Sequence, residues 1–323
     1  MTDNGSDLVI DSVSSPMTSK RTVAPGRQQA ADRFVSPRSG SHAKSEDWTL
    51  IIRSKTGWFD LHLGELWRYR DLVLMYVRRD FVAKFEQTLL GPLWFIIQPV
   101  LTTLTFTILF GNIAKLSTDG LPKVLFYLSG ITAWSYFSEC MTTASNTFYA
   151  NQHTFGKVYF PRLVVPLSTV ISNLLKFAIQ VGIFLVFYAY FVLEGATVRP
   201  TLALLLLPVL VLLMAALALG SGIIVSAVTV RYRDLRLLVQ FGLQLLMYST
   251  PVVFPLSKVP DNYRWLMLAN PMTPIIETFR YAFLGTGTFG WKYLALSSAT
   301  TLLILALGTL LFNRVEKTFM DTV

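Results

Sequence analysis

A proline-broken apolar segment between residues 240 and 285 constrains this fold more than any other feature. An apolar run ends near Ser249, and prolines follow at positions 251, 255, 260, 271 and 274. Proline lacks a backbone donor and kinks or ends a helix, so one membrane-spanning helix cannot run through this stretch. Unpaired backbone is costly in lipid. The segment therefore predicts a span, then short re-entrant helices at one membrane face, then a last span.

The composition of the whole chain is as apolar as that of an integral membrane protein. Hydrophobic residues make up 53% and charged residues 15% of the 323 residues, and the mean hydropathy is +0.50. A soluble domain of this length is less apolar. Several runs reach about 20 apolar residues, enough to cross about 30 Å of hydrocarbon. We therefore predict an all-α integral membrane fold with six transmembrane helices, at residues 92–112, 124–149, 166–192, 201–229, 237–254 and 291–312.

The distribution of basic residues predicts the orientation. Fourteen lysines and arginines flank the spans on one side and seven on the other. The positive-inside rule puts the richer side, and with it both termini, in the cytoplasm. The re-entrant helices between spans five and six then face outward. This bias accounts for the formal net charge of +9, so no nucleic-acid partner is expected.

Four regions are expected along the chain. Residues 1–50 are rich in serine and polar groups and predict a disordered cytoplasmic tail, residues 51–90 an amphipathic interface or gate region, residues 91–315 the six-span domain and residues 316–323 a cytoplasmic C-terminus. In the second region Leu74, Val77 and Phe81 share one helical face. Such a helix in the inner interface is either an anchor or a gate and docking element.

Two ionisable residues inside predicted spans need an explanation, because burying a charge in lipid is costly. Glu139 lies in the second span and Lys176 in the third, at similar depth. They either form an ion pair between neighbouring helices or face a hydrophilic passage. Asn173 and Gln180 share the polar face of Lys176.

An aromatic cluster on the second span has two explanations. Trp134, Tyr136 and Phe137 lie among serines and threonines. Sugar C–H faces pack on aromatic rings while sugar hydroxyls exchange hydrogen bonds with hydroxyl side chains. The same pattern is also typical of ordinary packing between spans. With Glu139, Asn173, Lys176 and Gln180, these residues are the candidates for a substrate channel.

Soluble-enzyme chemistry is weakly represented. The sequence has no GxxxxGK[ST] loop, its three histidines form no metal-binding spacing, and no acidic pair suits a sugar-nucleotide metal site. We therefore predict no catalytic residue, no metal site and no cofactor bound by this chain. The single cysteine, Cys140, permits no internal disulfide.

Several motifs, in a fixed order, resemble one transporter family. They are Leu90-Gly91-Pro92-Leu93-Trp94 with Gln98-Pro99, the turn Arg231-Tyr232-Arg233-Asp234-Leu235-Arg236, Thr250-Pro251-Val252-Val253-Phe254-Pro255, Tyr263-Arg264-Trp265, Asn270-Pro271-Met272 and Ile276-Glu277-Thr278-Phe279-Arg280. Over residues 60–315 the chain resembles the ABC type 2 permeases that export cell-surface polysaccharides such as O-antigen, capsule and teichoic acid.

The resemblance implies a function and partners. The chain would be the transmembrane permease subunit of an ATP-driven exporter in the bacterial inner (plasma) membrane. It would form a homodimer above separate ATPase subunits, which bind ATP and Mg²⁺, so that this chain is not an enzyme by itself. The cargo would be a lipid-linked polysaccharide on a diphosphate carrier, moved from the cytoplasmic to the outer side.

The resemblance also implies roles for particular residues. Arg78, Arg79 and Lys84 at the inner mouth would attract the lipid diphosphate, although Arg79 could equally bind anionic membrane lipid. The candidates for coupling to the ATPase are Asn151, Phe155, Lys157 and Arg162, on a short helix that Pro161 and Pro166 would terminate. The outer re-entrant segment would contain Pro251, Asn270, Pro271, Glu277 and Arg280, and the last two are spaced to pair with each other.

The sequence is also compatible with three other functions. The same fold could export a drug or a lipid. An integral membrane glycosyltransferase or polymerase would require catalytic acids in its loops, and a passive channel or ion-coupled transporter would require no ATPase. A neighbouring ATPase gene would favour the exporters, and neighbouring glycosyltransferase genes would favour polysaccharide as the cargo.

Overall fold

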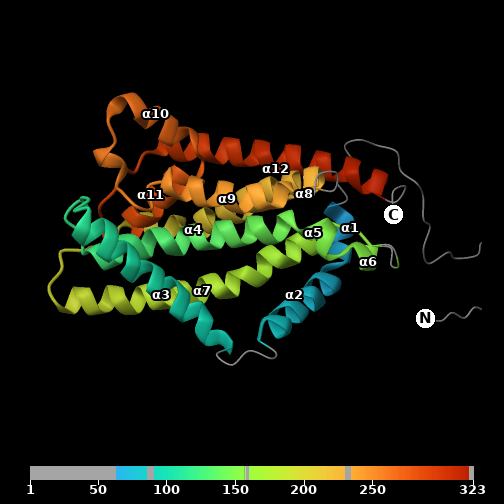
Figure 1. Cartoon of the computed structure of the whole chain (residues 1–323), viewed down its shortest axis with the longest axis horizontal. Helices are drawn as coiled ribbons and strands as arrows, with labels where there is room; N and C mark the ends of the chain where they lie inside the picture. Colours follow the sequence, from blue (N-terminus) through green and yellow to red (C-terminus); the bar gives the residue numbers. More distant parts are fainter. Residues whose placement is uncertain (1–62, 86–90, 156, 158–159, 230–233, 320–323) are drawn as a thin grey trace, which may run out of the picture. The chain divides into compact units, whose positions relative to one another are not determined.

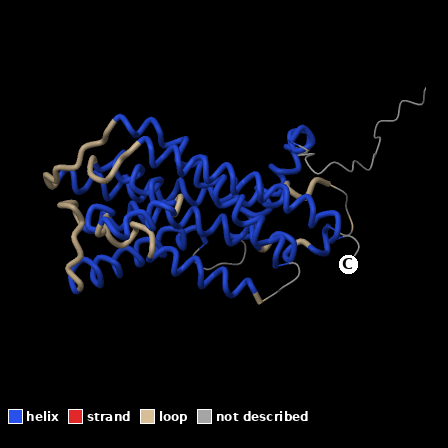
Figure 2. Tube along the Cα trace, turned by 90° about the horizontal axis from the view of Figure 1, so that it is seen from above, coloured by secondary structure: helices blue, strands red, loops and turns tan. Residues whose placement is uncertain are grey.

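The computed structural model describes residues 63–85, 91–155, 157, 160–229 and 234–319. The chain divides into two units, Met1–Ser54 and Lys55–Val323, and all of the described residues belong to the second. The predicted tail of residues 1–50 and the extreme C-terminus therefore lie outside them. Regular structure in the described part is entirely helical (Figures 1 and 2), which confirms the predicted all-α class.

In chain order the helices are α1 (Leu63–Arg68), α2 (Arg70–Phe85), η1 (Gly91–Leu93), α3 (Trp94–Phe106), η2 (Thr107–Ile113), α4 (Lys123–Ser145), α5 (Thr147–Ala150), α6 (Gln152–Phe155), α7 (Val164–Leu193), η3 (Leu202–Leu206), α8 (Leu207–Thr229), α9 (Leu235–Tyr248), η4 (Leu256–Lys258), α10 (Asp261–Ala269), α11 (Met272–Leu284) and α12 (Trp291–Phe319).

Within the described residues, four helical segments are long and apolar enough to cross a membrane. They are Trp94–Ile113, Val164–Leu193, Leu202–Thr229 and Trp291–Val315, and each overlaps one predicted span. The other two predicted spans are shorter or less apolar than expected. Helix α4 ends at Ser145 rather than residue 149, and its many polar residues lower its apolarity. Helix α9 has 14 residues, about 21 Å at about 1.5 Å per residue. The six-span arrangement therefore stays a prediction.

Helix α4 is the centre of the bundle. It packs against α7 on one side and α8 on the other, and α8 in turn packs against α12. Most of α4 is buried, from Leu125 to Trp134 without interruption. This burial explains how a helix with so many hydroxyl side chains holds its place, because those groups meet protein rather than lipid. Two hydroxyls, Ser129 and Thr132, donate to the carbonyl oxygens of Phe126 and Leu128 within the helix.

Glycines allow α8 and α12 to approach closely. A Cβ at Gly220 would lie 2.7 Å from the Cα of Leu305, and one at Gly308 would lie 2.5 Å from the carbonyl oxygen of Gly220. Both contacts are with backbone, which cannot turn aside as a side chain would. Small residues at such crossings are typical of packed membrane helices.

Gly220→Ala is therefore expected to destabilise the chain by about 1–3 kcal/mol, the usual range for overpacking. The matched control is Gly182→Ala in α7, where a Cβ would meet nothing within 4 Å. There the substitution removes only glycine's low helix propensity and is expected to stabilise by up to about 1 kcal/mol. Thermal unfolding of both purified variants measures the difference. Equal effects at the two sites would show that the α8–α12 crossing can open to accept a methyl group.

Opposite ends of the bundle hold different short helices. Figure 1 shows α2, α5, α6 and the C-terminal end of α12 at one end, which we call the α5–α6 end, and α10 and α11 at the other. The long helices lie side by side between these ends, and the perpendicular view in Figure 2 agrees. The elements predicted to be cytoplasmic thus gather at one end, and the proline-rich segment gathers at the other.

Helix α2 packs on α7 with a face that the sequence did not indicate. Val73 and Tyr76 are buried, in a cluster with residues of α5, α6, α7, α8 and α12. Leu74 and Phe81, from the predicted apolar face, are instead exposed. An exposed apolar face beside a buried one suits a helix that contacts both the protein and the membrane interface.

Candidate functional site

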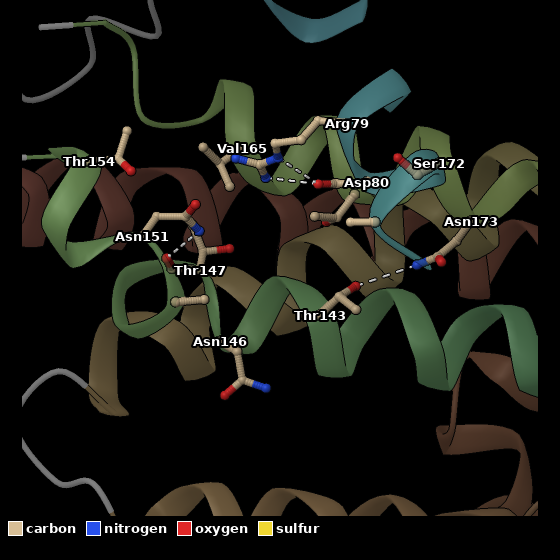
Figure 3. Close-up of a pocket in the computed structure, with 13 residues that line it drawn as sticks. Arg79, Asp80, Thr143, Asn146, Thr147, Asn151, Thr154, Val165, Ser172 and Asn173 are labelled. Carbon is tan, nitrogen blue, oxygen red and sulfur yellow. Dashed lines mark hydrogen bonds and ion pairs between the residues drawn. The ribbon is translucent and has the colours of Figure 1, made fainter. Parts of the chain in front are cut away.

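A polar pocket of about 530 Å³ lies between α2, the α4–α6 segment and α7 (Figure 3). Its lining contains three asparagines, five hydroxyl side chains and one oppositely charged pair. These residues are Arg79, Asp80, Thr143, Asn146, Thr147, Asn151, Thr154, Thr169, Ser172 and Asn173, and three small apolar residues, Ala83, Ala150 and Val165, complete the lining. We refer to this site as the polar pocket.

Helical spacing brings these side chains together. Thr143 lies near the end of α4, Thr147 begins α5 four residues later, and Asn151 follows the end of α5; all three line the pocket. On α7, Ser172 and Asn173 lie one turn after Thr169. Because α4 and α7 pack against each other, the two polar stripes face one another, and α2 closes the third side.

Most hydroxyls in the pocket donate to backbone carbonyl oxygens three or four residues earlier in the chain, which leaves lone pairs on the hydroxyl oxygens. The Thr143 Oγ1 donates to the carbonyl oxygen of Glu139 at 2.8 Å, and the Thr147 Oγ1 donates to that of Ala144 at 2.8 Å. The Asn173 Nδ2 donates to the Thr143 Oγ1 at 3.4 Å, across the α4–α7 boundary. A hydroxyl that donates to backbone still accepts hydrogen bonds, so these groups can contact a ligand rich in donors.

The charges in the pocket neutralise each other. The Arg79 Nη2 lies 2.8 Å from the Asp80 Oδ1, and the guanidinium stacks over the Tyr76 ring at 4.2 Å. Arg79, one of the residues predicted to attract the diphosphate, therefore lines the pocket. It is paired with the Asp80 carboxylate, a partner that the sequence did not predict. Arg78 is exposed and does not line the pocket, and the Lys84 side chain lies outside the described part.

The predicted ion pair inside the bundle is present. The Lys176 Nζ lies 3.3 Å from the Glu139 Oε2 and 5.5 Å from the centre of the Phe95 ring. Lys176 is one turn beyond Asn173, so polar side chains continue from the pocket toward this pair. The first of the two alternatives for Glu139 and Lys176 is confirmed, while their exposure to a passage stays a prediction.

The remaining channel candidates lie in the protein's own core. Trp134, Tyr136 and Phe137 are all buried, and the Tyr136 hydroxyl donates to the carbonyl oxygen of Val170 at 3.5 Å. Gln180 is buried as well. Within one chain these contacts fit the packing alternative for the aromatic cluster better than the sugar-binding one.

The predicted coupling turn is held by aromatic packing. Phe155 is buried against Phe148 and Phe160, and the Arg162 guanidinium lies 5.4 Å from the Phe155 ring. Asn151 lines the polar pocket and Lys157 is exposed. One detail of the prediction is wrong. Pro166 does not end a coupling helix but lies in the first turn of α7, where proline is tolerated because the N–H needs no helical partner.

The predicted outer residues form a buried network. The Arg280 Nη1 lies 2.8 Å from the Glu277 Oε1, and its Nη2 donates to the carbonyl oxygen of Pro251 at 2.8 Å. The Asn270 Nδ2 donates to the Thr250 Oγ1 at 3.0 Å, and the Ser297 Oγ donates to the carbonyl oxygen of Pro271. The expected pairing of Glu277 with Arg280 is thus confirmed.

Some partners in these sites could not be foreseen. Thr288 donates to Glu277 from its backbone N–H at 2.9 Å and from its hydroxyl at 3.1 Å, and Asp80 neutralises Arg79. Thr147 and Ser172 carried a signal in their helical spacing with Thr143 and Thr169. Asp80 and Thr288 carried none, because only the packing of α2 and the turn after α11 brings them into place.

Comparison with known proteins identifies the family. Residues 71–284 match the sequence profile of the ABC-2 type transporter, and the chain belongs to this family. It is 32% identical over 222 residues to the O-antigen export system permease protein RfbA of Myxococcus xanthus. The aligned residues cover 68% of this chain and 82% of that protein.

Two further relatives are similar over most of their length. The RfbA protein of Klebsiella pneumoniae is 25% identical over 252 residues, which is 78% of this chain and 94% of the relative. The polysialic acid transport protein KpsM of Escherichia coli is 26% identical over 249 residues, 76% and 93% of the two chains.

Proposed function

We propose that this chain is the transmembrane permease subunit of an ABC exporter that moves a lipid-linked cell-surface polysaccharide outward across the bacterial inner membrane. The observation that carries this proposal is the similarity to three polysaccharide-export permeases over 82–94% of their lengths. The chain is not an enzyme by itself, since ATP hydrolysis belongs to a separate subunit that binds ATP and Mg²⁺.

The arrangement of the bundle supports a six-span topology with both termini in the cytoplasm. Helix α4 has 23 residues, about 34 Å at about 1.5 Å per residue, and its burial allows it to cross despite its polar groups. Helix α9 continues into the buried loop at Val252 and Val253. The short helices α10 and α11 then form the outer re-entrant segment.

A homodimer is consistent with the exposed apolar surface of the bundle. Leu101, Leu104 and Ile108 on the α3–η2 segment and Leu238, Phe241 and Leu245 on α9 are all exposed. Two copies of the chain would enclose the translocation path between them, and lipid would cover the apolar surface that remains. The buried position of Trp134, Tyr136 and Phe137 favours packing within each copy over contact with the substrate, while Glu139 and Lys176 remain the polar candidates beside the path.

The α5–α6 turn is the element that we assign to coupling. Phe155 packs in the same cluster as residues of α2, α7, α8 and α12, and the Arg162 guanidinium lies over its ring. A force applied to α6 therefore reaches three spans, α7, α8 and α12, and the interface helix α2. Asn151 connects this cluster to the polar pocket, and exposed Lys157 is available to contact the ATPase.

Deletion of the gene tests the proposal. If the chain is an exporter, the deletion strain should lose its surface polysaccharide and accumulate lipid-linked polymer at the inner membrane. Supplying the complete gene should restore the surface polymer. Disappearance of the polymer from both places would indicate a synthase and would overturn the proposal. Unchanged surface polysaccharide together with impaired export of another lipid or drug would indicate that this chain exports that lipid or drug instead of polysaccharide.

A further inference from the structure

We propose that the polar pocket binds an uncharged sugar ring at the head of a membrane-anchored glycolipid, rather than its phosphate groups. This inference rests on the proposed function and specifies which part of the cargo the pocket contacts. The volume, about 530 Å³, falls in the range of about 300–1,000 Å³ that small-molecule sites occupy.

The first argument is the balance of donors and acceptors. Asparagine amides both donate and accept, and threonine and serine oxygens accept. Asn173 and Thr147 are buried and line the pocket, and each is oriented by a hydrogen bond that it donates, Asn173 to Thr143 and Thr147 to the carbonyl oxygen of Ala144. A sugar ring presents hydroxyls that donate and accept in several directions, which matches such a lining. Ala83, Ala150 and Val165 offer small apolar surfaces for its C–H faces.

The second argument is charge. A diphosphate is bound most tightly by unpaired arginines and lysines. The cation in the described lining, Arg79, already pairs with Asp80 at 2.8 Å, and the carboxylate would repel a phosphate brought close to it. Lys176 on α7, one turn beyond the lining residue Asn173, is also paired, with Glu139. The described lining is thus close to neutral, and neutral hydroxyl groups suit it better than an anion.

The third argument is the position of the pocket beside α2. The Arg79 side chain is about half exposed, and Ala150 at the rim is exposed, so the pocket is accessible from the surface. On the same helix, Leu74 and Phe81 present apolar side chains outward. A glycolipid has the corresponding two parts, a polar head for the pocket and an acyl or prenyl chain for an apolar surface.

Protection of an introduced cysteine tests the inference. Ser172→Cys places a thiol in the lining, and Ser298→Cys in α12 is its matched control. Both serines are half-buried and donate to the carbonyl oxygen four residues earlier at 2.8 Å. The native chain, whose single cysteine is the buried Cys140, gives the background. The complete permease–ATPase complex in lipid nanodiscs is labelled with a small maleimide.

Three probes distinguish sugar from phosphate and one sugar source from another. They are a synthetic lipid-diphosphate-linked oligosaccharide, the same lipid diphosphate without sugar, and octyl glucoside below its micelle concentration. At about ten times its dissociation constant, a ligand that fills the pocket should slow labelling at position 172 about tenfold, with no change at position 298. We expect protection by a sugar-bearing probe and none by the sugar-free diphosphate. Protection by the oligosaccharide but not by octyl glucoside would identify the export cargo as the ligand of the pocket. Protection by octyl glucoside as well would show that the pocket accepts any alkyl glycoside.

A charge variant tests the neutrality argument. Asp80→Asn leaves the Arg79 guanidinium without its carboxylate, so in this background the sugar-free diphosphate is expected to gain protection of Cys at position 172. Protection by that diphosphate in the unaltered Asp80 background would overturn the inference, and so would the absence of protection by every probe. Neither result would affect the proposed export function, which the deletion assay measures independently.

Discussion

Replacing Arg280 with methionine is expected to destabilise the chain by about 3–5 kcal/mol, the usual cost of leaving one member of a buried ion pair alone. The Glu277 and Arg280 side chains are 1% and 2% exposed. After the substitution the Glu277 carboxylate would keep only its hydrogen bonds from Thr288. The carbonyl oxygen of Pro251 would also lose its donor.

The location of this pair makes the effect broad. The Arg280 guanidinium lies 3.8 Å from the centre of the Phe126 ring on α4 and donates to the loop after α9. It therefore joins α4, α9 and α11 at one point. A Cβ at Gly130 would lie 3.2 Å from the Arg280 Nη2, so α4 provides room for the guanidinium at this position.

Thermal unfolding of purified variants measures the effect, with two controls. The double variant Glu277→Gln/Arg280→Met removes both charges and is expected to recover part of the loss, because no buried charge remains unpaired. Arg264→Met removes a pair with the same i,i+3 spacing in α10, where Arg264 and Asp261 are 3.9 Å apart and Asp261 is 96% exposed. Its expected cost is below about 1 kcal/mol. A similar loss for Arg264→Met and Arg280→Met would show that burial does not set the importance of the pair.

The spans were predictable where apolar residues continue without interruption. The runs at 92–112, 166–192, 201–229 and 291–312 each correspond to an observed helix, because a long apolar run has few alternatives to a helix in lipid. The predicted ends of α4 and α9 were less accurate. The Asn146 Nδ2 donates to the carbonyl oxygen of Thr142 where α4 ends, and such local side-chain bonds compete with the helical pattern. Pro251 prevents α9 from continuing to residue 254.

The polar pocket was only half predictable. Thr169, Asn173 and Lys176 repeat at helical spacing, so the polar face of α7 was evident in the sequence. The partner that closes the pocket was not, because α2 has apolar residues on more than one face. Periodicity selected the face of Leu74 and Phe81, whereas Val73 and Tyr76 pack on the protein. The choice between two apolar faces depends on lipid and on tertiary packing, and neither is contained in local sequence.

Phe155→Ala is expected to abolish export while the chain still inserts in the membrane. A buried phenylalanine replaced by alanine loses about 3–5 kcal/mol. Helix α6 has only four residues, so the Phe155 ring supplies much of what holds it against Phe148 and Phe160. Losing that energy raises the population of detached α6 more than about a hundredfold, since each 1.4 kcal/mol is a factor of ten. A detached turn cannot transmit movement of the ATPase to the spans.

The measurement combines an export assay with cross-linking between α6 and the ATPase. Phe184→Ala is the matched control, because Phe184 is fully buried in α7 but belongs to the other hydrophobic cluster. It is expected to lower the unfolding temperature to a similar extent while the cross-link persists. Phe155→Leu, which keeps most of the apolar volume, is expected to restore much of the export. Normal export by Phe155→Ala at normal protein levels would remove the coupling role from this turn. A lost cross-link in both alanine variants would show that general destabilisation, and not the packing of α6, breaks the contact with the ATPase.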